Sequence, residues 1–349
     1  MKNLMDMGLP ELKALMAELN EPAYRAKQVL EWLNRGERPE NMKNIPLALR
    51  EKLAERPFGG AVIKRTFVSQ LDGTLKFLFE LEDGELVEGV LMRYKHGNTL
   101  CLSTQVGCRM GCVFCASTLE GRVRNIRCGE MLAMVVAAER TQNRPAHESR
   151  AITNIVLMGS GEPLDNFDEV VAFLWRVTSK EGLNISPRNI SLSTCGLAPE
   201  IERLVNEAPH VTLCISLHAY NDAVRDNLLP INRKYPIRAV CEAADAYAKT
   251  TGRRVIFEYA LIDGVNASQQ DATALSLLLK GINCHVNLIP LNPVKERELA
   301  GVSRQDAARF ASWLSDGGIS ATVRREMGAD IEGACGQLRR RVLEEESGA

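Results

Sequence analysis

Three cysteines lie close together in the segment QVGCRMGCVFCAS, where Cys108, Cys112 and Cys115 form a C-x3-C-x2-C pattern. Thiolate ligands favour iron–sulfur clusters or zinc, and a closed structural zinc site needs four ligands. No fourth cysteine or histidine lies at short spacing, since Cys101 is seven residues before the first and Cys128 thirteen residues after the last. The pattern therefore predicts a metal centre with one open coordination position. Three core thiols are the poorer interpretation, because two glycines interrupt any packing period.

A second group of polar residues lies at the ends of apolar runs that have the composition of β-strands. Glycine lets a backbone approach a ligand closely, and one polar side chain at each successive strand end would form a ring of contacts to a polar cofactor. Taken singly, each is also compatible with a hydrogen-bonded strand end that binds nothing. The residues are Gly161 and Glu162 in MGSGEPLDN, Ser193 in STCG, Ser216 and His218 in ISLH, and Asn292 in LIPLNP.

The local sequence context separates functional from structural residues among the other cysteines and Glu88. Cys335 lies between Gly333 and Gly336 in a non-periodic segment, where a core thiol has little reason to be, so we interpret it as a functional thiol. Cys101 in TLCLST is typical of a buried strand cysteine, and Glu88 in LVEGV of a solvated strand residue. Apolar surroundings predict core thiols at Cys128, Cys195, Cys214, Cys241 and Cys284.

The elements that must position these residues change character twice along the chain. Residues 1–58 have apolar residues at helical spacing and predict an N-terminal helical accessory domain. From 59 to 95 the period becomes two, and Asp-Gly pairs divide the strands, which predicts a small β-meander. From 96 to 349 apolar runs alternate with helical stretches, so we expect an α/β fold with a parallel sheet, as a full or partial β/α barrel. The active site of such a barrel forms at the C-terminal ends of its strands.

Composition excludes several classes of protein. The 349 residues are 45% apolar and 25% charged, which excludes a disordered chain, and ten cysteines in a chain of this length do not make a disulfide scaffold. No apolar run approaches the ~20 residues needed to cross a bilayer. Asp6 and Glu11 lie where a secretory signal would need an unbroken apolar core, so we expect a cytoplasmic protein without membrane contact. The net charge of −1 provides no global electrostatic case for nucleic-acid binding.

The cysteine loop, placed directly after a predicted barrel strand, resembles that of the radical S-adenosylmethionine superfamily. Longer segments resemble one family within it, the RlmN-type methyltransferases, which modify adenine in 23S ribosomal RNA and in some transfer RNAs. This resemblance implies a partial (β/α)6 barrel with an N-terminal helical accessory domain, a small β-meander and a C-terminal catalytic loop. It covers nearly the whole chain, through YRAKQVLEWL, GTLKFLFEL, VLMRYKHGNTLC, MGSGEPLDN, SLHA, LLPIN, HVNLIPLNP and GADIEGACGQLR.

The resemblance also implies roles for residues and partners. It implies that Cys108, Cys112 and Cys115 hold a [4Fe-4S] cluster. Cys335 would carry the methyl group as S-methylcysteine, Cys101 would release the product, and Glu88 would be the general base. The implied partners are 23S rRNA, tRNA and a one-electron reductant such as flavodoxin, and the implied oligomeric state is a monomer. The residues implied to contact S-adenosylmethionine are Gly161, Glu162, Ser193, Ser216, Leu217, His218 and Asn292.

Departures from the family pattern are few, and alternatives stay open. Ser160 stands where Met is common, and Cys195 where we expect Ser. Cfr-type relatives, which methylate carbon 8 of adenine, carry GEAL where this chain has GEPL, so Pro163 favours carbon 2. The alternatives are a Cfr-type carbon-8 enzyme, a radical enzyme acting on a non-RNA substrate, and a non-enzymatic RNA-binding module with an iron–sulfur or zinc centre.

Overall fold

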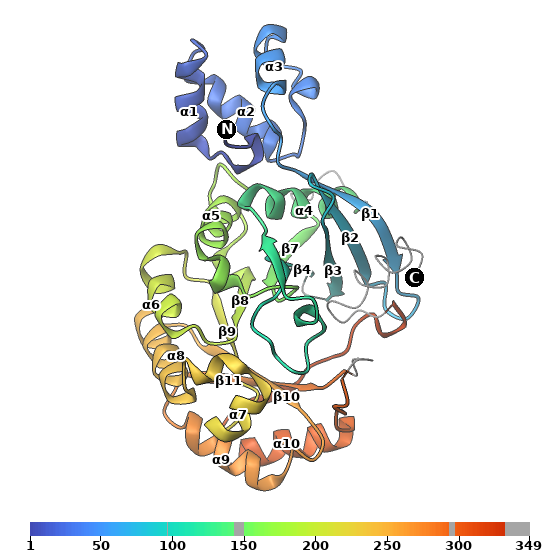
Figure 1. Ribbon diagram of the computed structural model, residues 1–349, viewed down its shortest axis with the longest axis vertical. Coiled ribbons are helices and arrows are strands. Elements are labelled where there is room, and N and C mark those ends of the chain that lie inside the picture. The colour runs from blue at the N-terminus through green and yellow to red at the C-terminus, as the bar shows by residue number, and fades with distance from the viewer. Residues whose placement is uncertain (96, 143–149, 293–296, 332–349) are drawn as a thin grey trace.

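A parallel sheet forms the centre of the computed structural model, which describes residues 1–95, 97–142, 150–292 and 297–331 (Figure 1). All seven apolar runs predicted after residue 96 are strands, and each pairs in parallel with the next. Within the described residues the sheet ends at β12 and does not close on itself, so the barrel is partial. The strands are β4 (Gly97–Leu102), β7 (Ile152–Leu157), β8 (Ile190–Thr194), β9 (Thr212–Ser216), β10 (Val255–Leu261), β11 (Cys284–Pro290) and β12 (Ala321–Val323).

Helices follow the strands and cover the outer face of the curved sheet (Figure 1). Each buries one apolar stripe, as α8 does with Val240, Ala244 and Ala248. That helix ends at Gly252, whose φ of 66° is the left-handed conformation that closes many helices. None of the helices in the described ranges is long and apolar enough to span a membrane. The helices are α4 (Cys128–Arg140), α5 (Phe167–Thr178), α6 (Ala198–Glu207), α7 (Asp222–Leu228), α8 (Ile237–Thr251), α9 (Gln269–Leu279) and α10 (Arg304–Asp316).

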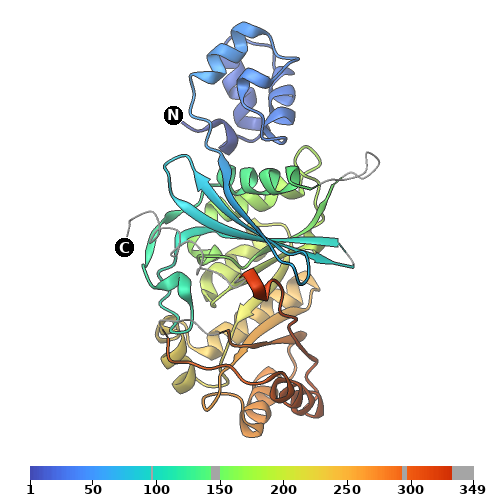
Figure 2. The ribbon, with the colours of Figure 1, turned by 90° about the vertical axis from the view of Figure 1, so that its right-hand side faces the viewer.

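The antiparallel strands β1 (Ala61–Val68), β2 (Leu75–Leu81) and β3 (Leu86–Tyr94) continue the same sheet (Figure 2). Strand β3 pairs antiparallel with β4, and this register sets Val90 opposite Cys101. Side chains alternate between the two faces of a strand. Phe77 and Phe79 therefore enter the main core, which includes α4, while Lys76 of the same strand faces the other side. The meander thus brings its own polar residues to the strand that precedes the cysteine loop.

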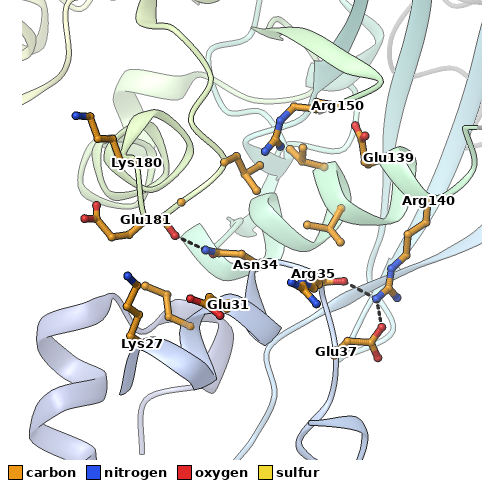
Figure 3. A pocket seen from close by; sticks show the side chains of 15 residues that line it. Lys27, Glu31, Asn34, Arg35, Glu37, Glu139, Arg140, Arg150, Lys180 and Glu181 are labelled. Atoms are coloured by element: carbon orange, nitrogen blue, oxygen red, sulfur yellow. Dashed lines mark hydrogen bonds and ion pairs between the residues drawn. The ribbon is translucent and has the colours of Figure 1, made fainter. Parts of the chain in front are cut away.

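The N-terminal helices α1 (Leu9–Glu18), α2 (Arg25–Leu33) and α3 (Leu47–Ala54) form a separate lobe that contacts α4. At one contact the backbone N–H of Gly129 donates to Asp6 at 2.8 Å. A Cβ at Gly129 would lie 2.5 Å from the same carboxylate, so the contact requires glycine. At another, Arg140 reaches Glu37 and the Arg35 carbonyl beside a charged cavity of about 810 Å³ (Figure 3). These polar contacts add to an apolar junction, because Leu4 and Met5 belong to the same buried core as α4.

Candidate functional site

The cysteine loop is the connection of a short hairpin formed by β5 (Gln105–Gly107) and β6 (Arg122–Asn125). The backbone N–H of Cys108 donates to the Gly121 carbonyl at 2.9 Å and closes the base of the loop. Gly107 has a φ of 73°, and a Cβ there would lie 2.0 Å from that carbonyl oxygen. The sequence pattern places the cysteines beyond the first barrel strand but does not predict this hairpin. Its strands fix both ends of the loop.

The three thiols line one cavity of about 300 Å³. Burial raises the pKa of Cys108 to about 12. Burial also raises the pKa of Cys112, and the neighbouring Cys115 and Cys108 thiols act in the same direction. Since a bound metal centre deprotonates its thiol ligands, these cysteines become thiolates at neutral pH when such a centre compensates their charge. A soft, all-sulfur donor set of this kind fits an iron–sulfur cluster.

The opposite wall of the cavity is built from the C-terminal ends of the strands. Six of the seven residues predicted to contact the cofactor line it, and they come from the ends of β7, β8, β9 and β11. The seventh, Leu217, does not line it. The Leu217 side chain is fully buried, its N–H donates to the Glu258 carbonyl, and its carbonyl accepts from Arg225. The lining residues of this set are Gly161, Glu162, Ser193, Ser216, His218 and Asn292.

Glu162 fixes two turns of this wall. Its carboxylate accepts the backbone N–H of Leu164 at 3.0 Å and that of Cys195 at 2.7 Å. Burial raises the pKa of Glu162, and these two hydrogen bonds oppose the rise. The preceding Gly161 has a φ of 105°, and a Cβ there would lie 2.6 Å from Gln105. Glycine is therefore needed where this turn passes against the start of the hairpin.

His218 presents a single protonation state to the cavity. Its Nδ1 accepts the backbone N–H of Ala260 at 2.9 Å, so the ring proton is on Nε2. Burial lowers the pKa of His218 to about 3, and the charge of Arg225 adds to the effect. The ring packs edge-on against Phe114 of the cysteine loop, with centroids 4.9 Å apart. His218 is therefore a neutral hydrogen-bond donor, held between the cysteine loop and β10.

Replacing His218 with asparagine is expected to reduce the acid sensitivity of folding. Asparagine tolerates the φ of 55° at this position. Below pH 6.5 the unfolded chain protonates His218 while the folded chain does so only near pH 3. The unfolded state then binds more protons, so the wild-type free energy of unfolding falls with pH by up to ~1.4 kcal/mol per unit. Urea titrations of the cofactor-free proteins between about pH 6.5 and 5 measure the slopes, and identical slopes would contradict this expectation.

Cys101 lines an adjoining cavity of about 230 Å³. The thiol is 5% exposed and packs with Val90 and Met92 of the neighbouring strand. The two cavities are contiguous, because both are lined by Met158, Ile289, Asn292 and Arg324. Cys101 is therefore a buried strand residue, as its context predicts. It also lines a cavity that is continuous with the cavity of the cysteine loop. Cys335, predicted as its partner thiol, lies outside the described residues.

Glu88 is buried, so the prediction of a solvated strand residue is wrong. Its carboxylate lies 3.0 Å from the ammonium group of Lys76, and the two side chains are 6% and 0% exposed. The alternation of LVEGV predicts a solvated residue because it gives no sign of Lys76, which the neighbouring strand β2 places beside Glu88. Glu88 and Val90 share that face, and Val90 pairs with Cys101. Glu88 therefore lies close to the Cys101 cavity, although it does not line it.

Two further side chains, Asp165 and Arg225, support the site, and the sequence pattern reveals neither. Asp165, after β7, accepts hydrogen bonds from Gln105, Arg109 and Arg122, and so ties the cysteine hairpin to the barrel. Burial acts to raise the pKa of Asp165, but the hydrogen bonds from Arg109 and Gln105 lower it overall.

Cys195, predicted as a core thiol, lines the cavity beside the cysteine loop. That prediction is incomplete, because its apolar context gives no sign of the turn that Glu162 fixes.

Arg225 is the second side chain that supports the site. Its guanidinium is fully buried and donates to the carbonyl oxygens of Cys195, Ser216 and Leu217 at 2.6 to 3.2 Å. It also donates to Asn232 of the LLPIN segment at 2.9 Å. One side chain thus satisfies the backbone at the ends of β8 and β9. An arginine in the short helix DAVRDNL is typical of a solvated residue, so only the fold reveals this position.

Two family models match the chain. Residues 102–276 match the Radical SAM superfamily, and residues 2–58 match the ribosomal RNA large subunit methyltransferase N-terminal domain. The first match contains the cysteine loop and the strand ends through β10. The second coincides with the separate helical lobe.

Curated proteins and a solved structure match over nearly the full length. The probable dual-specificity RNA methyltransferase RlmN of Clostridium botulinum strain Eklund 17B is 50% identical, over 98% of each chain. The protein of the same name from Clostridium perfringens strain 13 is 49% identical, again over 98% of each. The crystal structure of a radical SAM methyltransferase from Sphaerobacter thermophilus covers 97% of this chain and 99% of its own. Its TM-score is 0.90 at 44% identity.

Proposed function

Since this chain belongs to the RlmN family of radical S-adenosylmethionine RNA methyltransferases, we propose that it methylates carbon 2 of adenine 2503 in 23S rRNA and of adenine 37 in some tRNAs. The cofactors of the family are a [4Fe-4S] cluster and S-adenosylmethionine. The observation that supports the proposal best is a pair of contiguous cavities. Three thiols and four strand ends line the first, and Cys101 lines the second. Pro163 after Glu162 supports carbon 2 over carbon 8.

The cavity residues divide between the two cofactors. Cys108, Cys112 and Cys115 would hold the cluster. The Nε2–H of His218 would donate to an acceptor of S-adenosylmethionine, while the strand-end hydroxyls and the Glu162 carboxyl would hold its polar groups. Bound there, the cofactors supply one electron, a transferable methyl group and a radical that abstracts hydrogen.

Two thiols and a carboxylate would complete the reaction. Carbon 2 of adenine is electron-poor, so the Cys335 thiolate would first take the methyl group. That methyl would then lose one hydrogen atom to the cofactor-derived radical and bond to carbon 2 through the remaining methylene, and the adduct would return one electron to the cluster. Cys101 then attacks the Cys335 sulfur and breaks the carbon–sulfur bond, whose electron pair stays with the methylene carbon. Glu88 removes the proton from carbon 2, and the methylene carbon takes up one proton from solvent to become methyl. The two thiols are oxidised to a disulfide, which an external thiol must reduce before the next turnover.

The position of the cavity restricts the substrate. The loop cysteines, the strand ends and Cys101 line cavities of the partial barrel, so an adenine must leave its stack to enter them. Unpaired loops present such bases at little cost, whereas a paired base would first have to be extruded. The chemistry therefore favours loop adenines in rRNA and tRNA over adenines within a duplex.

The nucleoside product tests this proposal. Reconstituted enzyme, incubated anaerobically with 23S rRNA and with tRNA, is expected to produce 2-methyladenosine, because Pro163 and the full-length family membership both favour carbon 2. Liquid chromatography with mass spectrometry separates it from an 8-methyladenosine standard. A dominant 8-methyl product would indicate the Cfr-type reaction. No methylated adenine in either RNA, despite cleavage of S-adenosylmethionine, would indicate a radical enzyme with another substrate.

A further inference from the structure

The LLPIN segment (residues 228–232) packs against the cysteine loop, beside the residues that follow β7 and β8. It joins the end of α7 to the short 3-10 helix Pro230–Arg233 (Figure 1). The backbone N–H of Val113 in the loop donates to the Leu228 carbonyl at 3.1 Å. A Cβ at Gly111 would lie 3.5 Å from the Pro230 Cγ, which is an ordinary van der Waals distance, so the loop lies next to the Pro230 ring. Buried Asn232 fixes the segment from within, through hydrogen bonds to Arg225 and two aspartates.

A surface cavity of about 650 Å³ opens between this segment and the loop. Met110 lies between the first two cysteines of the loop. It lines both this cavity and the cavity that the three thiols line, which we call the catalytic cavity, so its side chain belongs to the wall between them. Leu197 and Ile231 add apolar lining, while Arg233 and Lys234 are exposed at the rim. We call the surface formed by Pro230, Ile231, Arg233, Lys234 and Tyr235 the rear patch.

The rear patch is positively charged. Among the residues that the structure describes, neither Arg233 nor Lys234 forms an ion pair with a carboxylate, and Lys234 lies over the Tyr235 ring at 5.1 Å. The carboxylate that lines this cavity, Asp165, is already paired with Arg109 and Arg122. Its charge is therefore compensated locally, and the two rim cations face solvent.

We propose that the rear patch is the docking surface for an acidic protein that donates one electron to the cluster. The proposal rests on the proposed function in that the three loop cysteines hold the cluster. In the step itself the reduced donor loses one electron and the cluster gains it, and no bond forms or breaks. Charge complementarity selects the partner, because cations around an apolar floor attract an acidic protein and accelerate its encounter.

The two cavities on either side of the cluster loop make simultaneous binding possible. The Cys101 cavity shares four lining residues with the catalytic cavity but none with the rear cavity. RNA that delivers a base toward Cys101 would therefore leave the rear patch accessible. RNA is also the less favoured occupant of the patch, since firm RNA binding uses several phosphate contacts, and the rim offers two unpaired cations around apolar lining.

The test reverses the two rim charges in the reconstituted holoenzyme. Arg233→Glu/Lys234→Glu is expected to lower the second-order rate constant for cluster reduction by reduced flavodoxin about tenfold at low ionic strength. The difference should shrink as salt is added, because salt screens the steering charges. Reduction by dithionite should be unchanged, since that small reductant needs no docking surface. The matched control, Arg254→Glu/Lys280→Glu, reverses two exposed charges at the opposite ends of the strands and should behave as wild type.

Three outcomes would overturn the proposal. The first is a flavodoxin rate equal to that of wild type. The second is an equal loss with dithionite, which would mean that the substitutions disturb the cluster itself. The third is weaker tRNA binding with an unchanged flavodoxin rate, which would assign the patch to RNA. Failure of the proposed function differs from all three, because wild-type enzyme would then accept electrons yet form no 2-methyladenosine.

Discussion

Replacement of Cys112 with alanine is expected to remove the iron–sulfur cluster and all formation of 5′-deoxyadenosine, while the chain still folds. Three thiols line the cavity, and two are too few to hold a four-iron cluster that leaves one iron open. The fold should survive because the loop is fixed by other bonds, from Cys108 to Gly121 and from Val113 to Leu228. For the anaerobically reconstituted protein, iron and sulfide analysis measures the cluster, liquid chromatography measures 5′-deoxyadenosine, and circular dichroism measures the fold.

Cys241→Ala is the matched control for that experiment. Cys241 is a buried thiol on α8 and does not line the catalytic cavity. Its loss should cost about 1 kcal/mol of stability, as small core truncations do, and leave the iron content unchanged. A wild-type protein that holds stoichiometric zinc and no iron would refute the assignment of the loop. So would a Cys112→Ala variant that keeps its iron.

Replacement of Cys101 with alanine is expected to trap the enzyme on its RNA. Cys335 can still be methylated and joined to the adenine, but no second thiolate attacks its sulfur, and a thioether does not break readily by itself. Cys101 and the loop cysteines line different cavities, so the cluster should assemble normally in the variant. A covalent protein–RNA adduct should therefore become the main product of a single turnover, visible on denaturing gels as a species that nuclease digestion removes.

Two variants control for the trapped species. The Cys101→Ala/Cys335→Ala variant should form no adduct, because the bonding thiol is absent. Cys214→Ala removes another buried strand cysteine, on β9, that lines neither cavity, and it should turn over without an adduct. Turnover by both the single and the double variant, or an adduct that forms without Cys335, would disprove the two-thiol mechanism.

The alternation of strands and helices was predictable because burial imposes a period on each element. Parallel strands are buried on both faces and become apolar runs such as NIVLMG. The hairpin of β5 and β6 was not predictable, since each strand is short and their pairing encloses a loop rich in cysteine and glycine. The continuity of the meander with the barrel was hidden for another reason. It depends on the pairing of Val90 with Cys101 across a turn, and not on any local pattern.

The residues of the site also fall into those that the sequence predicts and those that it does not. Thiol spacing and polar strand ends identify most of the cavity lining, because parallel strands bring their C-terminal ends to one edge of the sheet. Residues that act through buried contacts escaped this reasoning. Glu88 has the sequence context of a solvated residue, but Lys76 of the neighbouring strand β2 lies 3.0 Å away. Arg225 has the context of a surface helix residue, but it donates to three buried carbonyl oxygens. Local sequence pattern predicts the exposure of a strand or helix, and it does not predict which distant side chains pair with it.

The pairing of β3 with β4 also determines how small a working fragment of this protein could be. A fragment that begins at Gly97 would leave β4 as an open edge, with unpaired backbone groups beside the buried residues Leu100 and Leu102. Exposed apolar edges of that kind recruit other chains and aggregate. A fragment that begins at Ala61 would keep β4 covered and would lose only the helical lobe. The meander thus covers the edge of the barrel sheet, and a fragment must include it to keep β4 paired on both sides.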